Sequence, residues 1–230
     1  MCGITGLYAK DDLSIKDWKE YLDVWKWMEA RGEDASGIAI YYNNNKLTLS
    51  KMPIPSSIHS SYFAKLNIPI KNIKLSIAHA RAATSGSPIK NENNHPLYQY
   101  LDGKLITLVH NGVIFSGNER IREVDSDSLF YYIRKEKEFN DNVMIKTLEN
   151  TTGTLAILIT DGDVLYFYRN TSPLEYVEYD NFIVFASENL NKIYDKEVKK
   201  VEPYKLYKVE YGEIKEIADI NTLGYTYIRW

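Results

Sequence analysis

Cys2 combines two groups that nucleophilic catalysis can use. It supplies a thiol, and removal of Met1 would also give it a free α-amine. An α-amine titrates near ~7.7–8.0, so it can take the proton of its own thiol directly or through one water. Gly3 beside it lets a substrate approach the backbone. The alternative is that Cys2 is a small apolar side chain that stands near a terminus by chance.

Two hydrogen-bond donors follow the apolar run 105–109. Asn111 has a side-chain amide, and Gly112 has an unhindered backbone N–H. Two such donors at one point suit a negative charge that develops on oxygen. We expect a strand to end here, so the Asn-Gly pair could also be a simple turn.

Charges of opposite sign come from two further segments. Arg81 could hold a carboxylate through two parallel hydrogen bonds, Thr84 adds a hydroxyl, and His95 follows in a polar loop. Arg81 could also be a surface arginine in a mobile loop. Asp125 and Asp127 precede an apolar helical run, where a carboxylate could accept hydrogen bonds from an ammonium group or simply cap the helix.

These groups together fit one kind of substrate. A cation and an anion, held apart from a nucleophile, suit a zwitterionic amino acid that reacts at a side-chain amide some bonds away from its charged end. Glutamine matches that description.

The hydrophobic pattern predicts the elements that must position these side chains. A strand is expected over 4–8, directly after Cys2, and Ser14 with Asp17 forms a capping-box pattern before a helix that Gly32 ends. The other expected elements are a hairpin over 37–42 and 46–50, strands at 73–80, 105–109, 155–159, 164–168, 182–185, 206–210 and 213–215, and helices at 128–138 and 142–149. Hairpins with helices inserted in blocks predict an α+β fold with mainly antiparallel sheets.

Length and composition limit the class of protein. The 230 residues suit one domain over 1–230, and the net charge of −3 argues against a nucleic-acid-binding surface. No apolar run approaches the ~18 residues of a membrane span, and the start lacks a secretion signal. A single cysteine excludes an intrachain disulfide and fits a reducing compartment, so we expect a cytoplasmic protein without a membrane partner.

The ordered motifs resemble the glutaminase domain of class II glutamine amidotransferases, which are N-terminal-nucleophile hydrolases. The resemblance runs from residue 1 to about residue 188. Its segments are 1–6 (MCGITG), 31–39 (RGEDASGIA), 79–86 (HARAATSG), 94–97 (NHPL), 110–114 (HNGVI), 126–128 (SDS) and 185–188 (FASE).

The resemblance implies a four-layer αββα sandwich of two mainly antiparallel sheets, with Cys2 as the nucleophile at the end of the first strand. It implies that the Asn111 side chain and the Gly112 backbone N–H form the oxyanion hole. Arg31 and Asp34 would be structural residues that orient the turn beneath the nucleophile strand.

The same resemblance implies the substrate contacts. Arg81 would hold the α-carboxylate of glutamine, with Thr84 and His95 assisting, and the segment 82–88 would close over the substrate as a lid. Asp127 would pair with the α-ammonium; it is preferred to Asp125 because the family motif is a Ser/Thr-Asp-Ser/Thr run.

The implied reaction is hydrolysis of the glutamine side-chain amide to glutamate and ammonia through a Cys2 thioester, with no cofactor and no metal. Relatives usually carry a second domain that uses the ammonia, so we expect a separate synthetase-like subunit to accept it. Ser85 and Ala82 stand where relatives that use fructose 6-phosphate carry histidine and tryptophan, which argues against that branch.

Three alternatives stay open at this point. The chain could be another amidohydrolase of the same class, which would need a large apolar acyl pocket. It could be a catalytically silent domain that senses glutamine or binds a partner. Cys2 could also join some of the histidines in a metal site, although their spacing is unlike that of ordinary zinc sites and His59 reads as a solvated loop residue.

Overall fold

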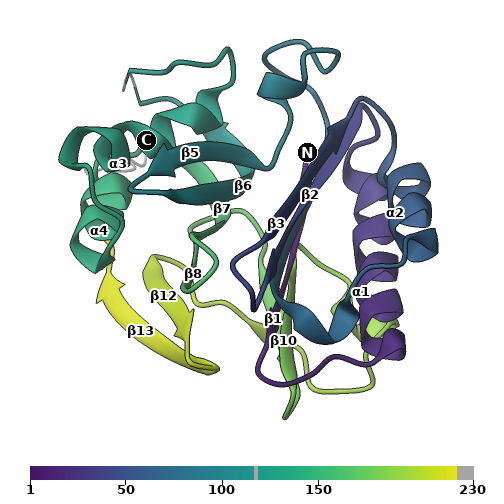
Figure 1. Cartoon of the computed structure of the whole chain (residues 1–230). Helices are drawn as coiled ribbons and strands as arrows, with labels where there is room; N and C mark the ends of the chain where they lie inside the picture. The colour runs from purple at the N-terminus through teal and green to yellow at the C-terminus, as the bar shows by residue number, and fades with distance from the viewer. Residues whose placement is uncertain (117–118, 222–230) are drawn as a thin grey trace, which may run out of the picture.

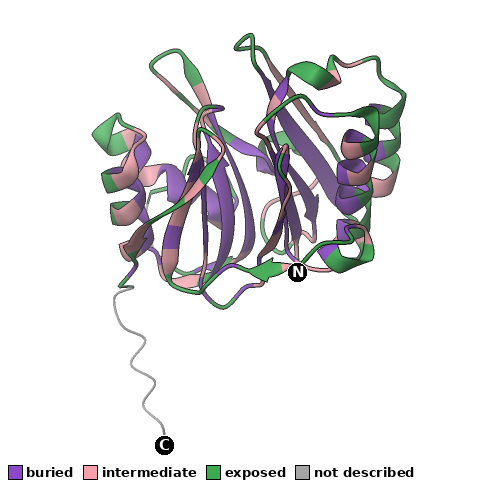
Figure 2. Cartoon of the chain, turned by 90° about the horizontal axis from the view of Figure 1, so that it is seen from below, coloured by how far each residue is buried: buried purple, intermediate pink, exposed green. Residues whose placement is uncertain are grey.

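Two β-sheets lie face to face between two outer layers of helices (Figure 1; Figure 2). The computed structural model describes residues 1–116 and 119–221. The strands are β1 (Gly3–Ala9), β2 (Ala35–Tyr42), β3 (Leu47–Met52), β4 (Ile73–Arg81), β5 (Leu97–Leu101), β6 (Lys104–Ile114), β7 (Gly153–Thr160), β8 (Leu165–Arg169), β9 (Glu175–Glu178), β10 (Phe182–Ala186), β11 (Lys199–Lys200), β12 (Lys205–Glu210) and β13 (Glu213–Asp219). The helices are α1 (Ile15–Trp27), α2 (Ser56–Lys65), α3 (Tyr131–Glu136) and α4 (Asp141–Glu149), with 3₁₀ turns η1 (Met28–Arg31), η2 (Ile70–Asn72), η3 (Asn91–Asn93), η4 (Asp125–Phe130) and η5 (Leu190–Lys192).

The strand order confirms the predicted αββα sandwich. One sheet runs β11-β9-β10-β1-β4-β2-β3 and the other β13-β12-β8-β7-β6-β5. Every strand pair given for the described residues is antiparallel. The strand that follows Cys2 is central, with β4 on one side and β10 on the other.

Both faces of β1 are buried, and strand alternation assigns its side chains to two different layers. Leu7 packs in the outer cluster beneath α1, whereas Ile4 and Tyr8 pack in the cluster between the two sheets. A third cluster covers the other sheet and includes Leu129, Ile133 and Leu148 from its helical layer.

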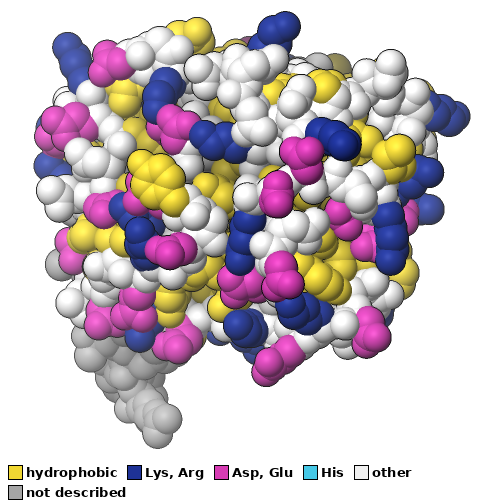
Figure 3. All heavy atoms as spheres, turned by 60° about the horizontal axis from the view of Figure 1, so that its bottom comes forward, with side chains coloured by type: hydrophobic (Ala, Val, Ile, Leu, Met, Phe, Trp, Pro, Cys, Tyr) yellow, Lys and Arg dark blue, Asp and Glu magenta, His cyan; other side chains and the backbone are white. Residues whose placement is uncertain are grey.

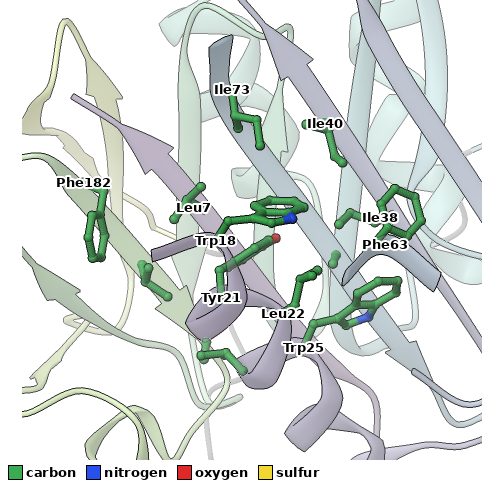
Figure 4. Close-up of a cluster of buried hydrophobic side chains, with 14 of the residues drawn as sticks. Leu7, Trp18, Tyr21, Leu22, Trp25, Ile38, Ile40, Phe63, Ile73 and Phe182 are labelled. Atoms are coloured by element: carbon green, nitrogen blue, oxygen red, sulfur yellow. The ribbon is translucent and has the colours of Figure 1, made fainter. Parts of the chain in front are cut away.

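Helix α1 begins as the sequence predicts. The Ser14 side chain accepts a hydrogen bond from the Asp17 backbone N–H, and the Asp17 side chain accepts one from the Ser14 N–H. The apolar side of the helix, which carries Trp18, Leu22 and Trp25, packs on the seven-stranded sheet (Figure 4). Burying these large side chains contributes on the order of 1.5–3 kcal/mol each, which fixes the layer behind β1 and β4.

The predictions of local structure were wrong or incomplete at several places. β6 continues through His110, Asn111 and Gly112 to Ile114, so the Asn-Gly pair is part of a strand and not a turn. The helix expected over 128–138 is the 3₁₀ turn η4 followed by the short α3. Helix α2 and the strands β5, β9 and β11 were not predicted, and His59, expected in a solvated loop, is buried in α2.

Charges are mixed on the face of the molecule shown in Figure 3, where lysine and arginine alternate with aspartate and glutamate. Within residues 1–116 and 119–221, no helix is long and apolar enough to cross a membrane.

Candidate active site

Cys2 lies immediately before the central strand β1 and beside the end of β4. The register pairs Gly3 with Ala80, so Cys2, the nucleophile candidate, and Arg81 lie together where these two interior strands end. On the β10 side, the Ile4 N–H donates to the Ser187 side chain over 3.1 Å, and the Ser187 N–H donates back to the Ile4 carbonyl over 3.0 Å. Together with the pairing to β4, these bonds hold the backbone next to Cys2 from both sides.

The last residue of η1 and the turn after it form hydrogen bonds with Cys2 and with the backbone at residues 81–83. Arg31 Nε donates to the Cys2 carbonyl over 2.8 Å, and its Nη1 pairs with Glu188 at 2.7 Å. The Asp34 N–H donates to the Arg81 carbonyl, and the Asp34 carboxylate accepts the Ala83 N–H over 2.7 Å. Arg31 and Asp34 therefore occupy the structural positions that the sequence indicates.

Gly32 is required in this turn because of a close backbone approach. A Cβ at Gly32 would lie 2.2 Å from the Ala82 backbone nitrogen, closer than any real contact. A larger residue would push the turn away from the end of β4 and misplace Arg81.

A small pocket joins several of the predicted residues. Its volume is only about 20 Å³, which is room for about one water. It is lined by Cys2, Arg81, Ala82, Thr84, Ser85, His95, His110, Gly112, Val124, Asp125 and Ser126. The pocket thus brings together the thiol, Arg81, Thr84, His95 and Gly112 of the sequence analysis, and at about 20 Å³ it would have to widen to admit a molecule of amino-acid size.

The folded environment of Cys2 favours the protonated thiol. Burial raises its pKa above the ordinary value, although a backbone hydrogen bond at Ala82 and the nearby Arg81 cation act in the opposite direction. A protonated thiol is a weak nucleophile, so catalysis would need a base within reach.

Asn111 has a buried amide without a partner. Its side chain is fully buried, and neither its nitrogen nor its oxygen has a hydrogen-bond partner among the described residues. Unpaired buried amides are rare in folded proteins because each costs about 1–3 kcal/mol. Asn111 does not itself line the cavity, but its neighbours His110 and Gly112 do.

Only glycine fits at position 112. Its φ is +146°, and a Cβ there would lie 1.8 Å from the Thr154 carbonyl oxygen. The strand β5 pairs with β6 only as far as Leu108, which leaves this part of β6 without a neighbour on one side. On that side, the Ile114 N–H donates to the Asp125 carboxylate over 2.7 Å.

The guanidinium of Arg81 is almost wholly buried and is held by Asn94 and the segment 82–88. It donates to the Asn94 side chain over 2.6 Å and to the backbone carbonyls of Ser85 and Gly86. These contacts fix the orientation of Arg81 and tie the segment 82–88 to it.

Of the two aspartates of η4, only Asp125 faces the cavity. Asp127 is fully buried and forms ion pairs with Arg122 and Arg134. The structure therefore does not bring Asp127, the predicted ammonium partner, to the site. The reason is the conformation of the turn: a 3₁₀ helix starts at Asp125 and turns residues two apart to different sides, which the motif alone does not reveal.

A buried pair of histidines stands at the site, one lining the pocket and the other stacked behind it. His95 stacks on His79 with ring centroids 4.3 Å apart, and both rings are buried. Burial and nearby cations hold the pKa of His95 well below its usual range, and burial lowers that of His79 to about 3. Neither ring nitrogen of His95 has a partner in the described part of the chain, so a substrate group could use them. No group of three histidine, cysteine or acidic side chains among residues 1–116 and 119–221 is arranged to hold a metal ion.

One charged residue near the site was not predicted. Lys51 of β3 lies over the Tyr98 ring, and its amine is buried without a hydrogen-bond partner among the described residues. Burial, with Arg122 nearby, lowers its pKa to about 8. It was missed because a lysine in a half-polar strand gives no sign of burial.

The fold and the cavity together define the class of protein: two antiparallel sheets between helices, with a cysteine before the central strand, are the architecture of N-terminal-nucleophile hydrolases. The family model "Glutamine amidotransferases class-II" matches residues 26–199, and the chain belongs to this family.

Known proteins of two kinds resemble the chain. Amidophosphoribosyltransferase of Methanothermobacter thermautotrophicus is 22% identical over 95% of this chain and 49% of its own length. Glutamine--fructose-6-phosphate aminotransferase of Staphylococcus aureus is 27% identical over 93% of this chain and 37% of its own length. Among solved structures, the B. subtilis glutamine phosphoribosylpyrophosphate amidotransferase superposes with a TM-score of 0.72 at 19% identity, covering 94% of this chain and 48% of the other. The chain spans about half or less of the length of these relatives.

Proposed function

We propose that this chain is a glutaminase that hydrolyses the side-chain amide of glutamine to glutamate and ammonia. The observation that carries the proposal is the single cavity that joins the Cys2 thiol, the Arg81 cation and the Asp125 anion. Family membership supports a glutamine amidotransferase role in general. The opposite charges on the cavity wall support a free amino acid as the substrate.

Removal of Met1 would supply the missing base. The Cys2 α-amine then takes the thiol proton, which matters here because burial keeps the thiol protonated. The sulfur attacks the amide carbon and forms a tetrahedral intermediate. Ammonia leaves with a proton returned by the α-amine, and water hydrolyses the thioester to glutamate.

Asn111 and Gly112 would stabilise the oxyanion of that intermediate. The Asn111 side-chain amide has no hydrogen-bond partner among the described residues, and it stands between His110 and Gly112, which line the pocket. Amide groups two residues apart in a strand point to the same side, so the Gly112 N–H should point to the side where the Ile114 N–H meets Asp125. Donors held in place before the reaction stabilise the developing charge without reorganisation.

Arg81 and Asp125 would bind the two charged groups of the amino acid. Arg81 pairs with the α-carboxylate, with Thr84 and His95 beside it, and Asp125 replaces Asp127 as the partner of the α-ammonium. The neutral histidines leave these two charges dominant in the cavity wall. The other amidohydrolase reading is not favoured, since the charged side chains of Arg81 and Asp125 both line the pocket.

The ammonia would pass to a separate synthetase-like partner. The relatives are at least twice as long as the aligned region, and two of them are named as transferases. If a partner consumes the ammonia, glutamine hydrolysis by the chain alone should be slow. A full hydrolysis rate without any partner would contradict this part of the proposal.

Intact mass measurement of the protein after incubation with 6-diazo-5-oxo-L-norleucine, a reactive glutamine mimic, tests the central claim. Protein that has lost Met1 should gain one adduct on Cys2, and glutamine should protect against it. Cys2→Ala should gain no adduct and lose hydrolysis by about 10⁴-fold or more. Labelling of chains that retain Met1 at the same rate would overturn the role of the α-amine.

A further inference from the structure

Helix α2 and the segments beside it carry far less charge than the rest of the chain. Residues 52–70 contain one charged residue, Lys65, although charged residues make up 26% of the chain. Helix α1, which lies next to α2 on the outer face of the same sheet (Figure 1), has six charged residues among its 13. Depletion of charge at the centre of a surface is typical of a protein interface.

Helix α2 is apolar on two of its sides. The side that faces the core carries Phe63, which is buried with its ring centroid 6.2 Å from that of Trp25. On another side, Ile58, Tyr62 and Leu66 follow one another at intervals of four residues and are 46%, 50% and 54% exposed. We call these three residues the apolar stripe. A surface helix normally has apolar residues only on its core side, so the stripe indicates a contact outside the chain.

The exposed apolar surface continues from the stripe to Met52 at the end of β3, which is 37% exposed. Ser36 pairs with Met52 in the sheet, and its hydroxyl lies 3.0 Å from a ring nitrogen of His59 in α2. The end of β3 therefore lies beside the first turns of the helix. Four half-exposed side chains supply less than the ~800 Å² that each partner buries in a stable complex, so the contact should be weak and depend on concentration.

The two ends of α2 carry opposite charges. At the start of the helix, the Glu29 carboxylate accepts the Ser57 N–H over 2.7 Å. At the other end, Lys65 is an exposed cation in the last turn. Two copies of such a helix fit together when they run antiparallel, because each Lys65 then comes to the end where the other copy holds Glu29. A parallel pair would bring like charges together.

A twofold axis at Tyr62 satisfies both features. It places Ile58 of one copy opposite Leu66 of the other, so the apolar stripes cover each other. It also brings Lys65 level with position 59 of the other copy, about 3 Å along the helix axis from Ser57 and its bond to Glu29. The surface is thus complementary to itself, as a twofold interface requires.

We propose that the apolar stripe of α2 binds a second copy of this chain, in an antiparallel pair centred on Tyr62 with Lys65 of each copy beside Glu29 of the other. This interface goes beyond the proposed glutaminase function and does not depend on it.

Sedimentation equilibrium of the full chain at ~1–300 µM tests the proposal. Wild-type protein should show a monomer–dimer equilibrium with a Kd in roughly the micromolar range. Tyr62→Glu places two like charges on the twofold axis, so Kd should rise by about 100-fold or more. The matched control is Tyr211→Glu, which adds the same charge at a tyrosine that is 87% exposed between β12 and β13 and should leave Kd unchanged.

Charge reversal tests the antiparallel arrangement. Lys65→Glu places an acidic group beside Glu29 of the other copy at two equivalent places, so Kd should rise by about tenfold. Combining Lys65→Glu with Glu29→Lys restores both pairs with their signs exchanged, and Kd should return to within about threefold of the wild type. Thermal unfolding of each variant reports whether it is folded, which matters because Glu29 also caps α2.

Each result decides for or against the proposal. A wild-type chain that sediments as a monomer over the whole range would overturn it, and so would a dimer that Tyr62→Glu leaves intact. A folded double variant whose Kd stays as high as that of Lys65→Glu would overturn the antiparallel pairing. If the double variant does not fold, an unchanged Kd in Lys65→Glu alone counts against that pairing. Failure of the proposed function would appear differently, as protein without Met1 that releases no ammonia from glutamine.

Discussion

The two ends of the sandwich differ in what their polar groups bind. β4 runs from one end, near Lys74, to the other, at Arg81. The end near Lys74 has a cavity of about 410 Å³, whereas the cavity at Cys2 has about 20 Å³. In the large cavity Lys104 pairs with Asp161 at 2.9 Å and Lys74 with Asp163 at 2.5 Å. The charges of the large cavity are thus satisfied within the protein.

The Cys2 end has the opposite character. The Asn111 amide and both ring nitrogens of His95 are buried without partners in the described part of the chain. Proteins rarely leave such groups unpaired unless they serve a function. The comparison teaches that unused hydrogen-bonding capacity, and not cavity size, distinguishes the candidate active site.

Among the substitutions that test this comparison, Asn111→Leu should have the largest effect. Asn111→Leu removes one oxyanion donor, so kcat should fall by about 10²–10³-fold. The same change removes an unpaired buried amide, so the free energy of unfolding should rise by about 1 kcal/mol or more. Stopped-time ammonia assays and chemical denaturation measure the two effects.

Asn170→Leu is the matched control. Asn170 is also buried, but its side chain accepts the Leu155 N–H over 2.6 Å and donates to the Gly153 carbonyl over 2.8 Å. This variant should keep its activity and lose stability. A loss of stability in Asn111→Leu that matches the loss in Asn170→Leu would show that the Asn111 amide is satisfied after all.

A smaller effect is expected at Arg81. Arg81→Met removes the partner of the substrate carboxylate, so KM should rise by about 10–100-fold, with a smaller change in kcat, because this end of the substrate does not react. Arg169→Met removes an arginine that is likewise bonded to backbone carbonyls but is remote from the cavity, and it should leave KM unchanged. A fall in kcat alone would contradict the assignment of Arg81.

Acid should destabilise the Cys2 end first. Burial lowers the pKa of His59 to about 4 and that of His79 to about 3, below the value of about 6.5 in an unfolded chain. The unfolded state then binds more protons between pH 6.5 and 4, so stability is lost as pH falls through this range, by up to about 1.4 kcal/mol per pH unit for each histidine. The Lys104 contacts lower the pKa of Asp163 from an already low value, so the other end weakens only below that range.

Chemical denaturation at a series of pH values checks this order. His59→Gln should reduce the slope between pH 6.5 and 4, because glutamine takes up no proton. A stability curve that is flat over this range in the wild type would mean that the buried histidines are already charged.

The positions of several site residues could be predicted from the sequence, because short motifs determine the backbone conformation around them. Cys2, Arg81 and Gly112 line the same pocket, since each belongs to a strand or strand end whose hydrophobic pattern is clear. The sequence analysis preferred Asp127 to Asp125 on the family motif, and a motif does not state which side of a 3₁₀ turn each carboxylate faces. His59 was misplaced because its burial depends on Ser36 and Ser50, whose side chains bond to its two ring nitrogens from distant strands.

The smallest effect is expected in the large cavity. Asp163→Asn breaks the contacts of Lys74 and Lys104 at a half-exposed position, so the free energy of unfolding should fall by less than about 1 kcal/mol. Glutamine hydrolysis should stay within about twofold of the wild type, because the Asp163 end of β4 is remote from Cys2. Steady-state assays of ammonia release measure this directly, with Lys146→Met, which breaks another exposed ion pair with Glu136, as the control. A tenfold loss of hydrolysis in Asp163→Asn alone would mean that the two ends of the sandwich are coupled, and that the satisfied charges of the large cavity take part in the reaction.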